Sequence, residues 1–213
     1  MEDVLDLYAQ PYDPLRPVVV FDETTKQLVQ EVRTPLPAQP GQSGQAGQPQ
    51  RYDSEYARNG VANLFLLAEP LAGWRQVEVT AQRTKSDFAQ QMKTLVEVHY
   101  PQAEVIRVVL DNLNTHTPVA LYEAFAPEEA RRLVEKLEFH YTPRHGSWLN
   151  MAEIELSVLT RQCLDRRIPD AQTLRQEVAA WQAARNQQQV KIKWCFNVAD
   201  ARTKLKRLYP SRS

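Results

Sequence analysis

One stretch decides the fold of this chain: Val105-Ile106-Arg107-Val108-Val109-Leu110-Asp111. Four of its first six residues are β-branched, and such a nearly continuous apolar run is typical of a strand buried on both faces. The polar sequence at 112–118, Asn-Leu-Asn-Thr-His-Thr-Pro, follows and predicts a loop. The stretch therefore predicts a strand buried on both faces whose carboxylate, Asp111, lies at the sheet edge where open α/β folds bind their ligands.

A second run has the same form, Pro17-Val18-Val19-Val20-Phe21-Asp22-Glu23. If the two strands lie side by side, Asp22 and Asp111 face each other at one edge of the sheet. Two carboxylates held that close repel unless a cation lies between them or one of them takes up a proton. Taken alone, the two acids are equally explained by the capping of turns, so a third residue has to decide.

The remaining elements are predicted from hydrophobic periodicity and from capping signals. They are, in order, strands at 17–22, 26–33, 60–69 and 74–80, a helix capped by Thr84 and stopped by Pro101, the strand at 105–111, one or two helices within 118–135, a strand at 137–141, and helices at 148–164 and after Asp170. The early strands should form an antiparallel meander, with the short strand at 26–33 as an addition, and strands joined by helices should be parallel. We therefore expect an α/β fold with a five-stranded mixed sheet and helices on both faces.

Composition divides the chain further. Residues 1–16 have no clear period and are expected to be a connector that leads from a part upstream. The catalytic core is predicted at 17–165, with a mobile loop inserted at 34–58, because a Pro-, Gly- and Gln-rich segment cannot bury enough apolar area to order itself. Residues 166–213 are expected to form a helical, basic extension that packs on this core.

The 213 residues are 43% hydrophobic and 24% charged with zero net charge, as in an ordinary soluble domain, which counts against a dedicated basic nucleic-acid binder. The charge is uneven, however. Residues 1–31 carry seven acids against two bases, and residues 185–213 carry eight bases against one acid. This asymmetry fits a metal site at one end and a polyanion contact at the other, and it fits a solvated basic tail equally well.

Cysteine content and hydropathy indicate the compartment. Cys163 and Cys195 form no disulfide framework, and we expect both to be buried thiols in a reducing cytoplasm. The sequence opens with no leader, and its apolar runs fall short of the roughly 20 residues that a membrane span needs. A cytoplasmic location is the prediction.

A third motif, Ser147-Trp148-Leu149-Asn150-Met151-Ala152-Glu153, adds an acid at the start of a predicted helix. Together with Asp22 and Asp111, it resembles the catalytic domain of DDE transposases of the mariner-like superfamily, and within it the bacterial insertion-sequence six-thirty family. The resemblance covers residues 17 to about 208. The 41 residues between Asp111 and Glu153 are compatible with the longer spacings of that family. Met151-Ala152 departs from the proline that mariner-like relatives carry there.

The resemblance implies a ribonuclease H-like fold in which Asp22, Asp111 and Glu153 are the catalytic residues. It implies that they bind two Mg²⁺ ions, with Mn²⁺ as a substitute. Two such ions, about 4 Å apart, activate the attacking oxygen and stabilise the leaving oxygen of a phosphodiester, and oxygen ligands suit them. Water then cuts the ends of the element, and the freed 3′-hydroxyl attacks target DNA.

The partners implied are transposon-end and target DNA, a second copy of the chain in a homodimeric complex, and a separate product that carries the helix-turn-helix modules expected ahead of this domain. The side chains predicted to contact DNA are Asn112, His116, Lys191, Lys193, Lys204 and Arg207. Two alternatives remain open: a standalone ribonuclease H-like nuclease that cuts without joining, and a non-catalytic transposase fragment that acts only by DNA binding or dimerisation.

Helical geometry leaves the third acid open between Glu153 and Glu155. They are two residues apart, about 200° around the axis, and flank the apolar stripe of the helix on opposite sides. The resemblance selects Glu153, which follows Leu149-Asn150 at the offset of the family. Glu155 is then expected to meet solvent or a surface arginine such as Arg161.

Overall fold

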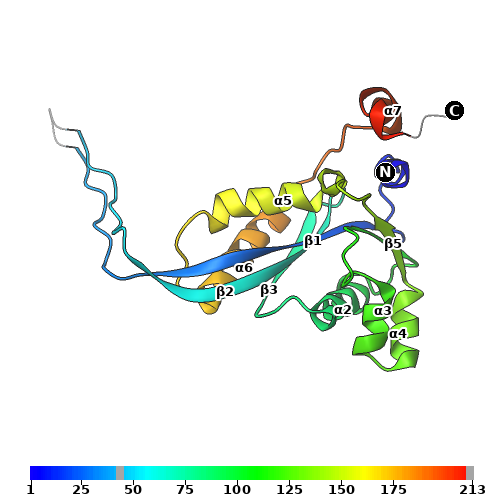
Figure 1. The fold of residues 1–213 in the computed structure, drawn as a ribbon, viewed down its shortest axis with the longest axis horizontal. Helices are drawn as coiled ribbons and strands as arrows, with labels where there is room; N and C mark the ends of the chain where they lie inside the picture. Colours follow the sequence, from blue (N-terminus) through cyan, green and yellow to red (C-terminus); the bar gives the residue numbers. More distant parts are fainter. Residues whose placement is uncertain (42–45, 210–213) are drawn as a thin grey trace.

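The computed structural model describes residues 1–41 and 46–209, and its centre is a five-stranded mixed sheet (Figure 1). The strands are β1 (Val18–Glu31), β2 (Tyr56–Glu69), β3 (Trp74–Thr80), β4 (Ile106–Leu110) and β5 (Leu137–Tyr141), in the spatial order β3-β2-β1-β4-β5. β1, β2 and β3 pair antiparallel, whereas β4 is parallel to both β1 and β5. The predicted meander and the parallel crossovers are both confirmed.

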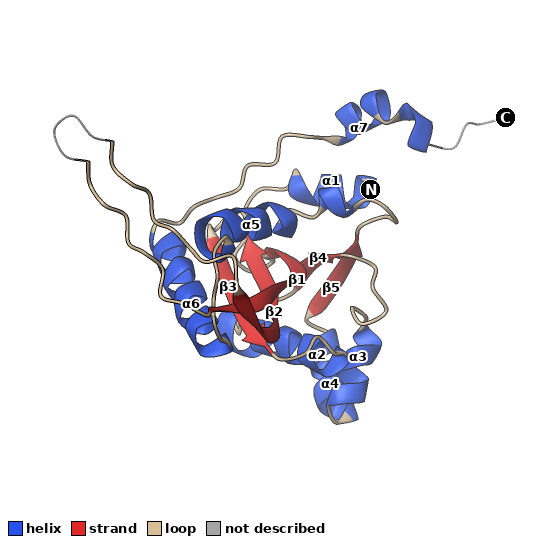
Figure 2. Ribbon diagram, turned by 60° about the vertical axis from the view of Figure 1, so that its left-hand side comes forward, coloured by secondary structure: helices blue, strands red, loops and turns tan. Residues whose placement is uncertain are grey.

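Helices cover both faces of the sheet (Figure 2). They are α1 (Glu2–Tyr8), α2 (Lys85–Thr94), α3 (Pro118–Ala124), α4 (Pro127–Val134), α5 (Ala152–Leu159), α6 (Ala171–Gln187) and α7 (Val198–Lys204). Alternate residues of β1 point to opposite faces, so Val19 and Phe21 join the core beneath α2, α3 and α4. Val20 joins the other core, which includes residues of α1, α5, α6 and α7. Each helix layer therefore has its own apolar contact with the sheet.

Several local predictions agree closely with the structure. β3 and β5 have the predicted bounds, and the pair α3 and α4 occupies the segment predicted for one or two helices. The capping box of α2 is present, because the Thr84 side chain accepts from the backbone N–H of Asp87 and the Asp87 carboxylate accepts from that of Thr84. α6 begins after Asp170, whose side chain accepts from the backbone N–H of Thr173.

Residues 1–16 are not an unfolded connector, which corrects that prediction. They contain α1, in which Val4, Leu5 and Leu7 are buried against the core. The Tyr8 hydroxyl donates to the carbonyl of Leu149 at 2.9 Å. A helix of seven residues is too short to show a clear period, which is why the sequence did not reveal it.

The first strand also differs from its prediction. β1 continues unbroken to Glu31 alongside β2, so residues 26–33 do not begin a separate strand. Beyond β1 and before β2, the described residues of the predicted loop at 34–58 form a paired ribbon that extends away from the sheet (Figure 1). Backbone bridges join Leu36 to Arg51 and Gln39 to Gln48. Pairing satisfies the backbone polar groups of the ribbon without burial of apolar side chains.

The C-terminal part extends along the α1 side of the molecule. α7 packs against α1, and Nε and Nη2 of Arg202 donate to the two oxygens of the Glu2 carboxylate, each at 2.7 Å. The division into a core at 17–165 and an extension at 166–213 remains a prediction, and residues 210–213 lie outside the described part.

Cys163 is buried as expected, but Cys195 is exposed, which corrects that prediction. Among residues 1–41 and 46–209, no helix has both the length and the apolar character that a bilayer crossing requires.

Candidate active site

Asp22 and Asp111 lie at the same edge of the sheet because of the parallel register of β1 and β4. Val20 is opposite Val109 in this register, so the positions two residues further along both strands are the two acids. Burial, together with the charges of Asp111, Glu23 and Glu153, raises the pKa of Asp22 to about 7. A hydrogen bond from the Glu23 backbone N–H acts in the opposite direction. The charges of the other two predicted site acids, Asp111 and Glu153, therefore act on Asp22.

Asn150 connects the third acid to this edge. Its side chain is 1% exposed, donates to the carbonyl of Phe21 at 2.8 Å and accepts from the backbone N–H of Ala152 at 3.1 Å. One amide thus ties the first turn of α5 to the residue before Asp22. Glu153, in that first turn, has an exposed side chain. The Asn-x-x-Glu spacing therefore has a geometric purpose: the asparagine anchors the helix that carries the acid.

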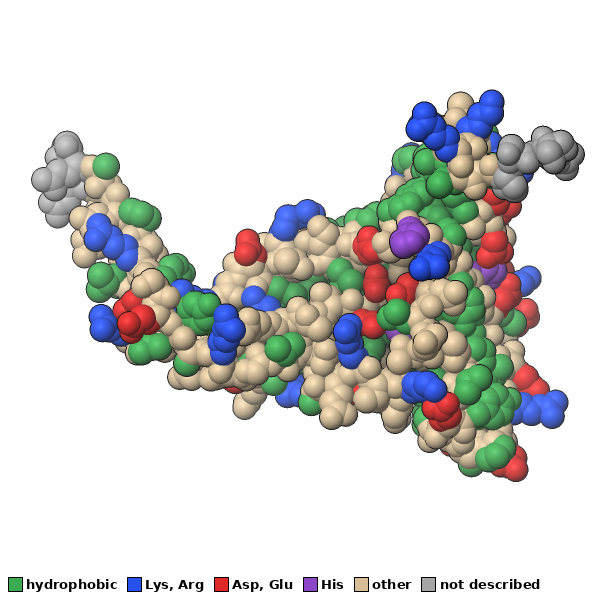
Figure 3. Space-filling model, viewed as in Figure 1, with side chains coloured by type: hydrophobic (Ala, Val, Ile, Leu, Met, Phe, Trp, Pro, Cys, Tyr) green, Lys and Arg blue, Asp and Glu red, His purple; other side chains and the backbone are tan. Residues whose placement is uncertain are grey.

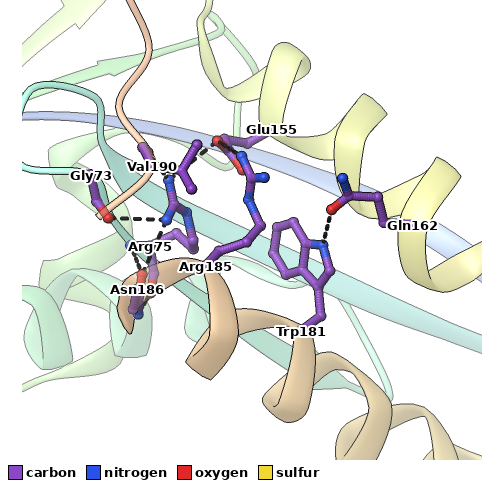
Figure 4. Close-up of polar contacts among 8 residues, drawn as sticks. All are labelled: Gly73, Arg75, Glu155, Gln162, Trp181, Arg185, Asn186 and Val190. Carbon is purple, nitrogen blue, oxygen red and sulfur yellow. Dashed lines mark hydrogen bonds and ion pairs between the residues drawn. The ribbon is translucent and has the colours of Figure 1, made fainter. Parts of the chain in front are cut away.

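Glu155 has a different environment from the one predicted. It is 0% exposed, and its Oε1 lies 3.3 Å from Arg75 Nη2 and 2.8 Å from Arg185 Nη2 (Figure 4). Arg161 instead donates to the Ser157 hydroxyl. The prediction of a solvent-facing Glu155 is wrong because its true partners come from β3 and α6, far away in the sequence.

Arg75 connects this buried carboxylate to two further segments. Its guanidinium donates to the carbonyls of Gly73, at 3.0 Å, and Val190, at 2.5 Å. Figure 4 shows these contacts converging from the β2–β3 turn, α6 and the segment that follows α6. Because α5 carries both Glu153 and Glu155, the network fixes the rotation of that helix.

His116 is buried between two acids. The ring is 1% exposed, with Nδ1 2.5 Å from Asp111 Oδ1 and Nε2 2.9 Å from Glu23 Oε2. Burial lowers the pKa of the imidazole, but the hydrogen bond to the Asp111 carboxylate and the nearby Glu23 carboxylate outweigh it and raise the pKa to about 9. The predicted DNA contact through His116 is therefore corrected, since a ring without exposed surface cannot reach a phosphate. The side chain of Glu23 is only 6% exposed.

The other predicted DNA contacts are on the surface. Their side chains are all exposed: Asn112, Lys191, Lys193, Lys204 and Arg207. Figure 3 shows acidic side chains gathered near the start of α5 and basic side chains gathered over α7 on the same face. Exposure permits a contact with DNA and does not test it.

The donor set at the edge consists of carboxylates, which suit Mg²⁺ or Mn²⁺. The pKa of Asp22 is raised first by burial and then by the charges of the neighbouring acids, and a bound cation would oppose both effects. Within the described ranges 1–41 and 46–209, no three His, Cys, Asp or Glu side chains surround a common point as ligands. The residues fit divalent ions by the chemistry of their oxygen ligands, and the register of β1 and β4 places Asp22 and Asp111 at one edge of the sheet.

Comparison with known proteins defines the class. The model of the family described as DDE superfamily endonuclease matches residues 17–175. The chain belongs to this family, as the resemblance of its three acidic motifs predicts, whereas its place in the six-thirty branch remains a prediction. No curated protein matches it.

Two solved structures share the fold. The crystal structure of the Mos1 strand transfer complex has a TM-score of 0.58 and 16% identity, over 88% of this chain and 54% of that chain. The mariner Mos1 paired end complex with Mg has a TM-score of 0.52 and 16% identity, over 98% of this chain and 60% of that chain. The fold is thus the ribonuclease H-like fold of the Mos1 transposase catalytic domain, and the chain spans somewhat over half the length of those proteins.

Proposed function

We propose that this chain is the catalytic domain of a DDE transposase that cleaves DNA and transfers strands during transposition of an insertion sequence. The observation that carries the proposal is the parallel register that brings Asp22 and Asp111 to one sheet edge, where the charge of Glu153 also raises the pKa of Asp22, in a chain of the DDE superfamily of endonucleases. The titles of the structural relatives name strand transfer and paired ends for Mos1, and this supports the same reaction class here.

Asp22, Asp111 and Glu153 would hold two Mg²⁺ ions, for which Mn²⁺ substitutes. When bound, these ions activate an attacking oxygen and stabilise the leaving oxygen of a phosphodiester. Asp111 is held on the end of a fully buried strand, whereas Glu153 projects from the first turn of α5. Asp22 must give up its proton to bind, and its raised pKa places that loss close to neutral pH.

The DNA contacts proposed are to backbone phosphates. Lys191, Lys193, Lys204 and Arg207 are exposed cations in the C-terminal part, and Asn112 is exposed in the loop after Asp111. Cations that pair with phosphates position the duplex and carry no sequence information. We further propose transposon ends and target DNA as substrates, a homodimeric active complex, a separate helix-turn-helix product as partner, and a cytoplasmic, nucleoid-associated location.

The test is a nicking and joining assay on end-labelled DNA with Mg²⁺ or Mn²⁺, comparing the wild-type chain with Asp111→Asn. Metal-dependent cleavage followed by joined products, both absent in the variant, supports the proposal. Cleavage without joining would identify a standalone nuclease. DNA binding without cleavage under either ion would identify a non-catalytic fragment.

A further inference from the structure

A histidine links two acids at the candidate active site. Its ring nitrogens contact Asp111 from β4 on one side and Glu23 from β1 on the other, at 2.5 Å and 2.9 Å. Asp111 is a proposed ion ligand, and Glu23 directly follows another, Asp22. The bridge therefore connects the two strands at the point where the ligands meet.

The ring is held in place by its surroundings. It lies edge-on to Phe21, with ring centroids 5.1 Å apart and an interplanar angle of 88°, and its centroid is 5.0 Å from that of Phe88. The backbone is also held, because the N–H of His116 donates to Leu113 at 3.0 Å and the Tyr141 hydroxyl donates to the His116 carbonyl at 2.9 Å. A ring packed against two aromatic side chains and anchored at its backbone has little freedom to reorient.

The Asp111 side chain has less support from packing. It is 30% exposed and follows the last residue of β4, where a carboxylate can rotate about its side-chain bonds. The Glu23 carboxylate, by contrast, is nearly fully buried and also lies 3.9 Å from Arg83. The rigid partner is thus the Glu23–His116 pair, and the carboxylate that needs to be held is that of Asp111.

We propose that His116 is a positioning residue that holds the Asp111 carboxylate for ion binding through Nδ1, and that Glu23 fixes the ring through Nε2. The inference rests on the function proposed above. Groups bonded to metal ligands orient them, and their loss commonly weakens metal binding by about 10–100-fold. His116 therefore acts on the ions through Asp111, although it contacts neither DNA nor the reacting atoms.

Two substitutions separate the two contacts of the ring. In His116→Asn, the amide nitrogen occupies the place of Nδ1 and retains a donor for Asp111. In His116→Gln, the amide occupies the place of Nε2 and reaches Glu23 but not Asp111. His140→Gln is the matched control, since that histidine also lies between two acids, Asp3 at 2.8 Å and Glu138 at 3.0 Å, away from the site.

The first measurement is the dissociation constant of Mn²⁺ by calorimetry on proteins whose folding is verified by circular dichroism. We expect His116→Gln to raise it about 10–100-fold, His116→Asn to raise it less than about tenfold, and His140→Gln to leave it unchanged. Equal Mn²⁺ affinity in wild type and His116→Gln would overturn the proposal.

The second measurement needs no metal. The chain has four histidines, so their ring ¹⁵N resonances are separable by nuclear magnetic resonance in metal-free protein. Asp111→Asn should shift the Nδ1 resonance of His116, and Asp3→Asn should shift that of His140 instead. An unmoved His116 resonance in Asp111→Asn would overturn the bridge. If Asp111→Asn shifts the His116 resonance but the wild-type chain binds no Mn²⁺, the contact between His116 and Asp111 is supported and the proposed metal-dependent function is contradicted.

Discussion

Glu153 and Glu155 are two residues apart on α5, yet Glu155 is fully buried between two arginines whereas Glu153 is exposed and its charge acts on Asp22. About 200° of helix separates them, so one rotation of the helix decides both environments. The choice that helical geometry left open is made by the guanidinium groups of Arg75 and Arg185. Glu155 secures the helix, and Glu153 is left for the site.

The substitution Glu153→Gln is expected to abolish metal-dependent cleavage. The melting temperature of the metal-free protein should stay nearly constant or rise slightly, because one charge leaves a crowded group of carboxylates. The same exchange at Glu128, an exposed glutamate of α4, should leave both properties unchanged. Cleavage at wild-type rate by Glu153→Gln would remove this residue from the site.

Glu155→Gln should destabilise the fold itself. Removal of one partner from a buried ion pair leaves the other charge uncompensated, which typically costs about 3–5 kcal/mol of unfolding free energy. Urea denaturation of the variant measures this loss. Glu177→Gln, which removes a surface pair with Arg166, should cost no more than about 1 kcal/mol. If the two losses are equal, the buried network does not stabilise α5.

Stability should depend on pH through Asp22. Its pKa is raised from 3.8 to about 7, so the folded chain keeps a proton that the unfolded chain releases. This contribution to stability is fully present below pH 4 and is lost as the pH rises through 7. A shift of this size corresponds to at most ~4 kcal/mol, and relaxation around a partly exposed group reduces it to on the order of 2 kcal/mol.

The substitution Asp22→Asn removes that dependence. Urea denaturation with a chelator present should therefore show the variant gaining stability relative to wild type between pH 4 and pH 8. Asp6→Asn, at an exposed position of α1, provides the control. A difference between Asp22→Asn and wild type that does not change with pH would show that the carboxyl is ionised throughout.

Divalent ions should raise the melting temperature, since a ligand that binds only the folded chain stabilises it by about 2.7 kcal/mol at a hundredfold excess over its dissociation constant. Differential scanning fluorimetry with Mg²⁺ or Mn²⁺ detects this rise. The increase should largely vanish in Asp111→Asn, which itself should fold. An unchanged rise in that variant would exclude Asp111 as a ligand.

DNA binding by this chain should be weak and strongly dependent on salt, with little sequence preference, because its exposed cations would meet phosphates. Fluorescence anisotropy at several salt concentrations gives the slope of the logarithm of the binding constant against the logarithm of the salt concentration. The double substitution Lys204→Ala and Arg207→Ala should reduce that slope by about 2, close to 0.9 per lost phosphate contact. Tight, sequence-selective binding, or an unchanged slope in the double variant, would contradict a phosphate-only contact.

Local patterns were sufficient for much of the fold. The apolar run before Asp111 identified β4 as a strand buried on both faces, and the bounds of β3 and β5 were predicted correctly. The Thr84–Asp87 spacing identified the start of α2, which is closed by those two side chains. These signals are legible because each depends on residues within a few positions of one another.

The sequence by itself therefore determined the class of fold and the order of most of its elements, and its resemblance to a known family supplied the three acids proposed for the site. Only the tertiary structure decided that Glu155 meets Arg75, which is 80 residues away, and that His116 joins Glu23 to Asp111. It also decided that residues 2–8 form a packed helix. Periodicity reports that a side chain is covered, whereas the identity of the covering group depends on long-range packing, which one sequence does not encode in any local pattern.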